Sequence, residues 1–220
     1  MIKLRRIIST FQYISHNIDG FPHSQLVKQA CKGGADWVQL RVKGAAYKDW
    51  KKIALQAKTV CKKYDARLII NDNVKIANEI NADGVHLGKH DMDPVKARQI
   101  LGENVLIGAT ANTFEDILSL YKAKIDYIGL GPYRFTLTKK DLYHELGLKG
   151  YDEIMKMCVH NKIDIPIIAI GGVRLEDVEK LMKTGIYGIA VSSAINNTKN
   201  IVGKTKEFIS KLESLEEKQQ

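Results

Sequence analysis

Residues 37–71 read WVQLRVKGAAYKDWKKIALQAKTVCKKYDARLIIN, and one complete folding unit can be recognised in them. The stretch begins with an apolar run over residues 37–42 and ends with a second over residues 68–71. Short apolar and β-branched runs of this kind predict buried parallel strands. Between them, apolar side chains recur at helical spacing, which predicts a helix that buries one stripe and turns its lysines outward. The stretch is therefore interpreted as strand, helix and parallel strand.

The same alternation continues along the whole chain. Apolar runs that predict strands cover residues 4–9, 37–42, 68–71, 84–87, 105–109, 127–130, 166–170 and 188–192. Eight strands alternating with helices in about 200–250 residues are typical of a (β/α)8 barrel, whereas an open doubly wound sheet usually has fewer strands. We predict an α/β fold of the TIM-barrel class, formed by residues 1–220 as a single domain, because no Pro-, Gly- or Ser-rich linker interrupts the pattern. Residues 199–220 are expected to form the eighth helix, with a frayed polar end from about residue 213.

The composition excludes several classes of protein. A hydrophobic content of 45% over 220 residues is sufficient for a buried core, which excludes a disordered chain. The net charge of +9 favours an anionic partner: nucleic acid, a membrane surface or a phosphorylated small molecule. No apolar run approaches the roughly 18 residues of a membrane span, and no signal peptide is recognisable, so a cytoplasmic location is expected. The three cysteines are too few and too widely spaced for a disulfide framework or zinc site, and are expected to be reduced core residues.

The second predicted strand ends in polar and charged residues. In a barrel of this class the chemistry occurs at the carboxyl ends of the strands, so residues that follow each apolar run are site candidates. Alternation places Gln39, Arg41 and Lys43 on one side of the strand, and Leu40 and Val42 on the other. An amide and two cations facing inward indicate an anion site. The alternative is a structural ion pair between Arg41 and a barrel carboxylate, because a buried charge must be paired.

Carboxylates follow the next two predicted strands. Asp72 comes directly after Asn71, and Asp91 lies in the turn after the fourth strand. Two carboxylates at neighbouring strand ends can hold one hard cation, and Mg²⁺ usually takes one or two carboxylates plus substrate phosphate. Helix capping is the alternative for both, because each precedes a helical segment. His86 and His90 do not share a helical face, so structural roles are expected for them rather than zinc binding.

Two further segments have features of phosphate sites. Residues 129–141, GLGPYRFTLTKKD, combine glycines, threonine hydroxyls and lysines, which indicates either a phosphate-gripping lid or a solvated surface turn. Gly171 and Gly172 follow the seventh strand, and Ser192 and Ser193 follow the eighth. The loops after these strands form the standard phosphate site of the barrel, where backbone N–H groups point at the anion. One cation-rich site and one site of backbone donors together indicate two phosphorylated substrates.

These motifs resemble those of thiamine phosphate synthases. The resemblance rests on residues 39–43, 70–72, 84–88, 131–132 with 136–141, and 169–173, and it covers nearly the whole chain. It implies a transferase that joins hydroxymethylpyrimidine diphosphate to hydroxyethylthiazole phosphate and releases diphosphate. The implied mechanism is dissociative: a pyrimidine carbocation is captured by the thiazole nitrogen, and no protein nucleophile is needed. Departure of diphosphate requires neutralisation of developing charge, which cations and Mg²⁺ supply.

The resemblance also implies a role for each matching residue. Mg²⁺ would be the cofactor, held by Asp72 and Asp91. The pyrimidine diphosphate would be bound by Gln39, Leu40, Arg41, Val42, Lys43, Asn71, Thr110 and Lys139. The thiazole phosphate would be bound by Thr136, Leu137, Thr138, Gly172, Ser192 and Ser193. Of these, Arg41, Lys43 and Lys139 would be the catalytic residues. Neither nucleic acid nor membrane is expected as a partner, and a homo-oligomer is left open.

The chain departs from the usual family pattern at a few positions. Val42 stands where a Glu is usual, Thr110 and Asn112 stand where Ser and His are usual, and Arg134 with Phe135 replace Phe-Pro. Val42 should face away from its charged neighbours, so its effect on the diphosphate site is expected to be small.

Two other functions are alternatives to the synthase. The sister family of thiazole tautomerases uses a His base where Asn112 stands, and an asparagine amide cannot accept a proton at neutral pH. A basic RNA-binding or phospholigand-binding protein is the non-enzymatic alternative. Its lysines, however, are spread over helix faces without the interleaved aromatic residues that stack bases.

Overall fold

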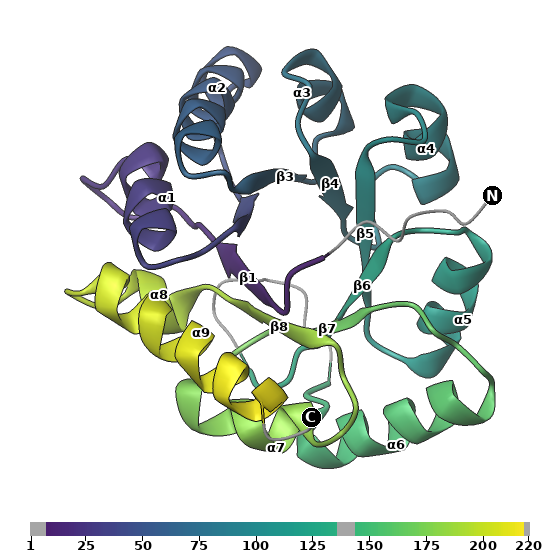
Figure 1. Ribbon diagram of the computed structural model, residues 1–220. Helices are drawn as coiled ribbons and strands as arrows, with labels where there is room; N and C mark the ends of the chain where they lie inside the picture. Colours follow the sequence, from purple (N-terminus) through teal and green to yellow (C-terminus); the bar gives the residue numbers. More distant parts are fainter. Residues whose placement is uncertain (1–7, 136–143, 218–220) are drawn as a thin grey trace.

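Eight parallel strands close into a barrel in the order β1 to β8 in the computed structural model, which describes residues 8–135 and 144–217. Figure 1 shows the ring of strands along the barrel axis, with the helices around its outside. The strands are β1 (Phe11–Ile14), β2 (Trp37–Leu40), β3 (Arg67–Asn71), β4 (Gly84–Leu87), β5 (Leu106–Ala111), β6 (Tyr127–Leu130), β7 (Ile167–Ala169) and β8 (Gly188–Val191). The helices are α1 (His23–Lys32), α2 (Tyr47–Lys63), α3 (Val74–Glu79), α4 (Pro94–Leu101), α5 (Phe114–Lys122), α6 (Gly147–His160), the 3₁₀ helix η1 (Leu175–Asp177), α7 (Val178–Met182), α8 (Ser193–Asn196) and α9 (Ile201–Glu216). The predicted (β/α)8 barrel is confirmed.

The first strand lies further along the chain than predicted. The prediction placed it over residues 4–9, of which 4–7 lie outside the described residues, whereas β1 begins at Phe11. The reason is Gln12, which interrupts the apolar run but is buried inside the barrel. There it accepts a hydrogen bond from Gln39 Nε2 (3.1 Å) and donates to the Tyr127 hydroxyl (3.4 Å). A polar residue that is satisfied in the interior thus breaks the apolar pattern by which a buried strand is recognised.

The last helix is longer than predicted. It begins after Asn200, whose side chain caps it by accepting from Gly203 N (2.9 Å), and continues to Glu216. The helix thus continues past residue 213, from which a frayed end was expected. Phe208 and Leu212 lie on the buried face of α9. Figure 1 places this helix between α1 and α7, so packing on both sides stabilises it.

Large side chains fill the barrel interior below the strand ends. The ring of Trp37 meets that of Tyr127 edge to face, with centroids 4.8 Å apart. Gly108 makes room for Tyr127, because a Cβ at this position would overlap the phenol ring. Ile69, Leu106 and Ile168 belong to the same buried cluster. Closely packed side chains thus fill the lower part of the barrel interior.

The main core lies between the strands and the surrounding helices. Cys31, Cys61 and Cys158 are buried there as free thiols, as expected from the sequence. Among the described residues, no helix is both long enough and apolar enough to cross a membrane.

Candidate active site

The carboxyl ends of the strands surround a cavity of about 720 Å³. The structure brings together on its wall most of the residues that the sequence predicted for the site: Gln39, Arg41, Lys43, Asn71, Asp72, Asp91, Thr110, Gly172, Ser192 and Ser193. The lid residues Thr136, Leu137, Thr138 and Lys139 lie outside the described residues.

The alternation predicted after β2 is present. Gln39, Arg41 and Lys43 line the cavity, while the side chains of Leu40 and Val42 are buried in the core between barrel and helices. Leu40 and Val42 can therefore reach a substrate only through their backbone. Val42 faces away from its charged neighbours, as expected.

Residues that follow β1 hold the backbone that follows β2. Arg41 N donates to Ser15 Oγ (3.3 Å), and Lys43 N donates to Asn17 Oδ1 (3.2 Å). His23 at the start of α1 joins both anchors, with Nδ1 3.0 Å from Ser15 Oγ and Nε2 3.2 Å from Asn17 Oδ1. Because Asn17 Oδ1 is an acceptor, His23 Nε2 carries the proton and Nδ1 accepts from the Ser15 hydroxyl. Burial is the main cause that lowers the pKa of His23 to about 4, so the ring is neutral near pH 7.

The two predicted carboxylates lie side by side on the cavity wall. Burial, followed by the hydrogen bond and charge of Asp72, raises the pKa of Asp91 to about 6. Lys43 forms an ion pair with Asp72. Burial lowers the pKa of Arg41, and the charge of Asp72 opposes this effect by favouring the charged guanidinium. Asp91 Oδ2 accepts from Gly88 N (2.6 Å). Arg41 thus faces the cavity and feels the charge of Asp72.

Helix capping does not explain either carboxylate. The cap of α3 is Asn73, whose side chain accepts from Ile76 N (2.9 Å). The cap of α4 is Asp93, which accepts from Val95 N (3.0 Å) and Lys96 N (3.1 Å). Asp72 has a left-handed backbone with φ of 66°, a conformation that is uncommon outside glycine and concentrates at functional sites.

A chain of hydrogen bonds crosses the barrel beneath the cavity. Gln39 Nε2 donates to Gln12 Oε1 (3.1 Å), and Gln12 Nε2 donates to the Tyr127 hydroxyl (3.4 Å). The hydroxyl lies 3.1 Å from His86 Nδ1, and His86 Nε2 lies 3.1 Å from Thr110 Oγ1. With Tyr127 donating to His86, the imidazole donates to Thr110. Gln39 Oε1 then faces the cavity as an acceptor and the Thr110 hydroxyl as a donor.

His86 thus has the structural role expected for it, inside this chain of hydrogen bonds. His90 is exposed at the rim of the cavity.

Asn112 occupies the position of the base expected in a tautomerase. Its Nδ2 donates to Gly131 O, and its Oδ1 has no hydrogen-bond partner among the described residues. Because the amide nitrogen donates, the side chain presents only a carbonyl oxygen, which is not basic enough to take a proton. The local geometry therefore argues against tautomerase chemistry.

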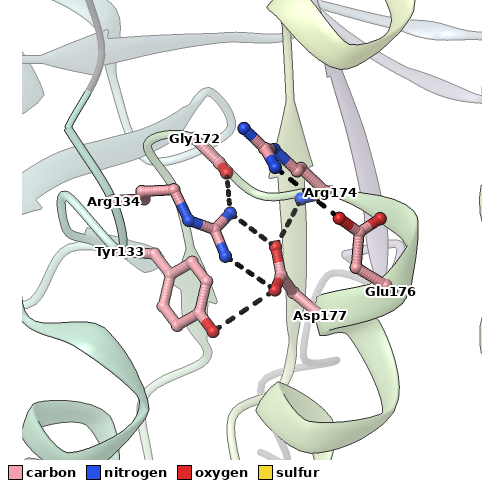
Figure 2. A network of polar contacts seen from close by, with 6 residues as sticks. All are labelled: Tyr133, Arg134, Gly172, Arg174, Glu176 and Asp177. Atoms are coloured by element: carbon pink, nitrogen blue, oxygen red, sulfur yellow. Dashed lines mark hydrogen bonds and ion pairs between the residues drawn. The ribbon is translucent and has the colours of Figure 1, made fainter.

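Arg134 ties the segment after β6 to the loop after β7, as Figure 2 shows. Nη1 donates to Gly172 O (2.8 Å) and to Asp177 Oδ2 (2.8 Å), while Nη2 donates to Asp177 Oδ1 (2.9 Å). Tyr133 donates to the same carboxylate (3.4 Å), as does Arg174 N (2.9 Å). Burial opposes ionisation of Asp177, but the hydrogen bonds from Arg134 hold its pKa below the ordinary value. The departure at Arg134 is thus a structural clamp on a predicted phosphate loop.

Sequence reasoning missed two cavity residues, His16 and Asn17. Both follow β1, and the first strand was placed too early for them to be seen as strand-end residues. The signal was present: the run FQYI at residues 11–14 is followed directly by Ser-His-Asn.

Known proteins resemble this chain over most of its length. Residues 13–195 match the family described as thiamine monophosphate synthase. A thiamine-phosphate synthase from Flavobacterium johnsoniae is 50% identical over 187 residues, covering 85% of this chain and 88% of that protein. One from Phocaeicola vulgatus is 46% identical over 198 residues, covering 90% and 95%. Among solved structures, thiamine phosphate pyrophosphorylase from Pyrococcus furiosus superposes with a TM-score of 0.83 at 30% identity, covering 94% and 96% of the two chains.

Proposed function

Because the chain belongs to the thiamine monophosphate synthase family, and is therefore a transferase, we propose that it joins hydroxymethylpyrimidine diphosphate to hydroxyethylthiazole phosphate and releases diphosphate. The observation that carries this proposal is that charged side chains and the two predicted phosphate loops line one cavity. Cations and paired carboxylates come from the ends of β2, β3 and β4, and the loops after β7 and β8 close the opposite wall. The cavity thus offers separate places for two anionic substrates.

The pyrimidine ring is proposed to lie over the hydrogen-bond chain at the cavity floor. Gln39 Oε1 supplies an acceptor for an exocyclic amine, and the Thr110 hydroxyl supplies a donor for a ring nitrogen. Asn71 is buried beside them on the same wall. Each hydrogen bond in this chain fixes the donor and acceptor of the next one. The cavity floor therefore favours a ring that donates to Gln39 and accepts from Thr110 over a ring with the reverse pattern.

The diphosphate is proposed to lie against Arg41 and Lys43. The Arg41 guanidinium can bind two phosphate oxygens at once, whereas the Lys43 ammonium provides a point charge. Ser15, Asn17 and His23 hold the backbone of this segment before substrate arrives, so little ordering is required on binding.

Asp72 and Asp91 fit a site for Mg²⁺. The two carboxylates are adjacent, and the charge of Asp72 contributes to the raised pKa of Asp91, so a cation between them would relieve their repulsion. When bound, Mg²⁺ would neutralise negative charge on the departing diphosphate, with substrate oxygens and water completing its ligands.

The reaction is proposed to proceed by departure of diphosphate before the new bond forms. The Arg41 and Lys43 side chains stabilise charge on the departing group, which lowers the barrier to breaking the carbon–oxygen bond. The thiazole nitrogen then captures the pyrimidine carbocation. The protein holds the two rings together and contributes no covalent intermediate.

The test is incubation of purified protein with both phosphorylated substrates and Mg²⁺, with chromatographic detection of thiamine phosphate. Asp91→Asn should lower the rate, whereas Asp93→Asn, the matched change at the cap of α4, should retain activity. Absence of product from correctly folded protein would end the synthase proposal.

A further inference from the structure

His16 lies on the cavity wall between two predicted substrate sites. Its Nδ1 is 3.0 Å from Ser192 Oγ, at the end of β8, and the positive charge of Arg41 acts on its ring from the end of β2. Ser192 also lines the cavity. A single imidazole therefore connects the hydroxyl of one site with the cation of the other.

Asn196 determines which way the Ser192 hydroxyl can point. Tyr13 donates to Asn196 Oδ1, so this atom is the carbonyl oxygen and the other is the amide nitrogen. Asn196 Nδ2 donates to Ile14 O (2.8 Å) and to Ser192 Oγ (3.2 Å). Asn196 is buried, so this orientation is held by the protein interior. One lone pair of Ser192 Oγ is thereby occupied, and its proton remains free to choose a partner.

The resting tautomer of His16 follows from the same contacts. Asn196 Nδ2 also lies 3.4 Å from His16 Nδ1, and both possible neighbours of this nitrogen can donate to it. The neutral ring therefore accepts at Nδ1 from the Ser192 hydroxyl and carries its own proton on Nε2. In this state the Ser192 proton points at the imidazole and is withheld from the cavity.

We propose that His16 is a positioning residue that takes up a proton when a phosphate dianion binds beside Ser192, and thereby turns the Ser192 hydroxyl toward the phosphate. The proton comes from solvent and adds to His16 Nδ1. The new Nδ1–H donates to Ser192 Oγ, and the hydroxyl proton released from this contact rotates to donate to a phosphate oxygen. No bond between heavy atoms is made or broken. This inference rests on the proposed function, because it concerns the phosphate group of the proposed thiazole substrate.

The groups around His16 favour such a change. Arg41, after β2, and His23, from α1, are the charged or titratable partners of His16 in the described part of the chain. The side chains from α8 and its end are neutral: Ser192, Asn196 and Asn197. Burial, and then the charge of Arg41, lower the pKa of His16 below its ordinary value, while a hydrogen bond with Asn197 partly offsets them. A dianion in the cavity compensates the Arg41 charge and adds an opposite charge beside the ring, so it favours the imidazolium.

Histidine NMR spectra of the full-length protein test this directly. Sulfate is the probe, because it carries two negative charges throughout the range from pH 5 to pH 8, and chloride at equal ionic strength is the control. His16 is assigned by the signal that is lost in His16→Gln. In chloride, His16 should titrate below its ordinary pKa with Nε2 protonated in the neutral form. In saturating sulfate its titration should move upward by about one pH unit or more, and Nδ1 should gain the proton.

Sulfate affinity should show the same coupling. A pKa change of one unit corresponds to a tenfold change in affinity, so sulfate should bind about tenfold tighter at pH 5 than at pH 8. In His16→Gln, where the side chain can still donate to Ser192 but cannot titrate, the pH dependence should shrink to the part contributed by Asp91, whose pKa is about 6 and which lines the same cavity.

Two results would overturn the proposal: a titration of His16 that is the same in sulfate and chloride, or a His16→Gln variant that keeps the full pH dependence of sulfate binding. The titrations in sulfate and chloride use unaltered protein, and the His16→Gln variant serves only to assign the His16 signal. Turnover is measured separately with both substrates. A protein that binds sulfate as described but forms no thiamine phosphate would contradict the proposed function and leave the proton coupling intact.

Discussion

Replacement of Arg134 by Met tests whether the clamp in Figure 2 holds the loop after β7. Methionine keeps the length of the apolar stem but removes all three donated hydrogen bonds, two to Asp177 and one to Gly172 O. The Asp177 side chain is only 7% exposed, so its charge cannot turn to solvent. It keeps two weaker partners, Arg174 N and the Tyr133 hydroxyl.

The expected loss of stability can be worked from these contacts. Breaking a fully buried ion pair costs about 3–5 kcal/mol, but Arg134 is 34% exposed and Asp177 retains a backbone donor, so we expect about 2–3 kcal/mol. For a chain of this size, 1 kcal/mol shifts the melting temperature by about 2–4 °C. Arg134→Met should therefore melt about 5–10 °C lower than the unaltered protein. A double-mutant cycle with Asp177→Asn should give a coupling of about 1 kcal/mol or more.

Arg174→Met provides the matched control in the same loop. Arg174 pairs with Glu176 at 3.8 Å, and both side chains are well exposed, so the free energy of unfolding should change by less than about 0.5 kcal/mol. Circular dichroism monitors the unfolding of both variants by heat and by urea. If Arg134→Met melts within about 1 °C of Arg174→Met, the clamp does not stabilise this loop and the reasoning fails.

Four further predictions concern the cavity and its supports. The sequence predicts that Lys139 grips the departing diphosphate, so Lys139→Ala should lower kcat/KM by about 10² or more, and Lys140→Ala by less, because successive side chains of an extended segment point to opposite sides; the reverse order would show that this sequence-based register is wrong. Arg41→Lys should lower kcat/KM although the charge is unchanged, because an ammonium lacks the planar fork that contacts two phosphate oxygens at once; equal rates would limit Arg41 to compensating the charge of Asp72. Asp72→Asn or Asp91→Asn should weaken the mutual enhancement of Mg²⁺ and diphosphate binding in calorimetry, with Asp93→Asn as control; unchanged coupling would remove both from the metal site. The pKa of His23 is lowered to about 4, so this side chain binds fewer protons in the folded protein than in the unfolded chain. The free energy of unfolding should therefore fall as the pH drops from 6.5 toward 4, and it should fall less steeply in His23→Gln; the same pH dependence in both proteins would contradict this.

Local periodicity was sufficient to predict the cation-rich wall. Along β2 the side chains alternate, so neighbouring positions alone determine that Gln39, Arg41 and Lys43 share a side. The same locality explains the error at β1. There Gln12 is compatible with a buried strand only because Gln39 and Tyr127 supply its hydrogen bonds from other strands. A partner distant in sequence cannot be read from the residue itself.

The clamp and the helix caps show the same limit. Arg134 and Asp177 are 43 positions apart, and nothing in either neighbourhood indicates that they meet. Asp72 and Asn73 have similar capping tendencies, so their order in the sequence does not reveal which one caps α3. The left-handed backbone at Asp72 decides it, because that conformation is incompatible with the extended cap and leaves the task to Asn73.

Two histidines after β1 lie close together but differ in what they can do. His23 has both nitrogens committed: Asn17 requires a donor at Nε2, so Nδ1 of the neutral ring is the acceptor for the Ser15 hydroxyl. Protonation at Nδ1 would break this arrangement, and no bound anion is needed to complete it. His16 differs because its partner Ser192 faces the cavity, where a phosphate can take over the hydroxyl proton. The same imidazole chemistry therefore gives a fixed support for the cations at one position and a ligand-dependent proton acceptor at the other.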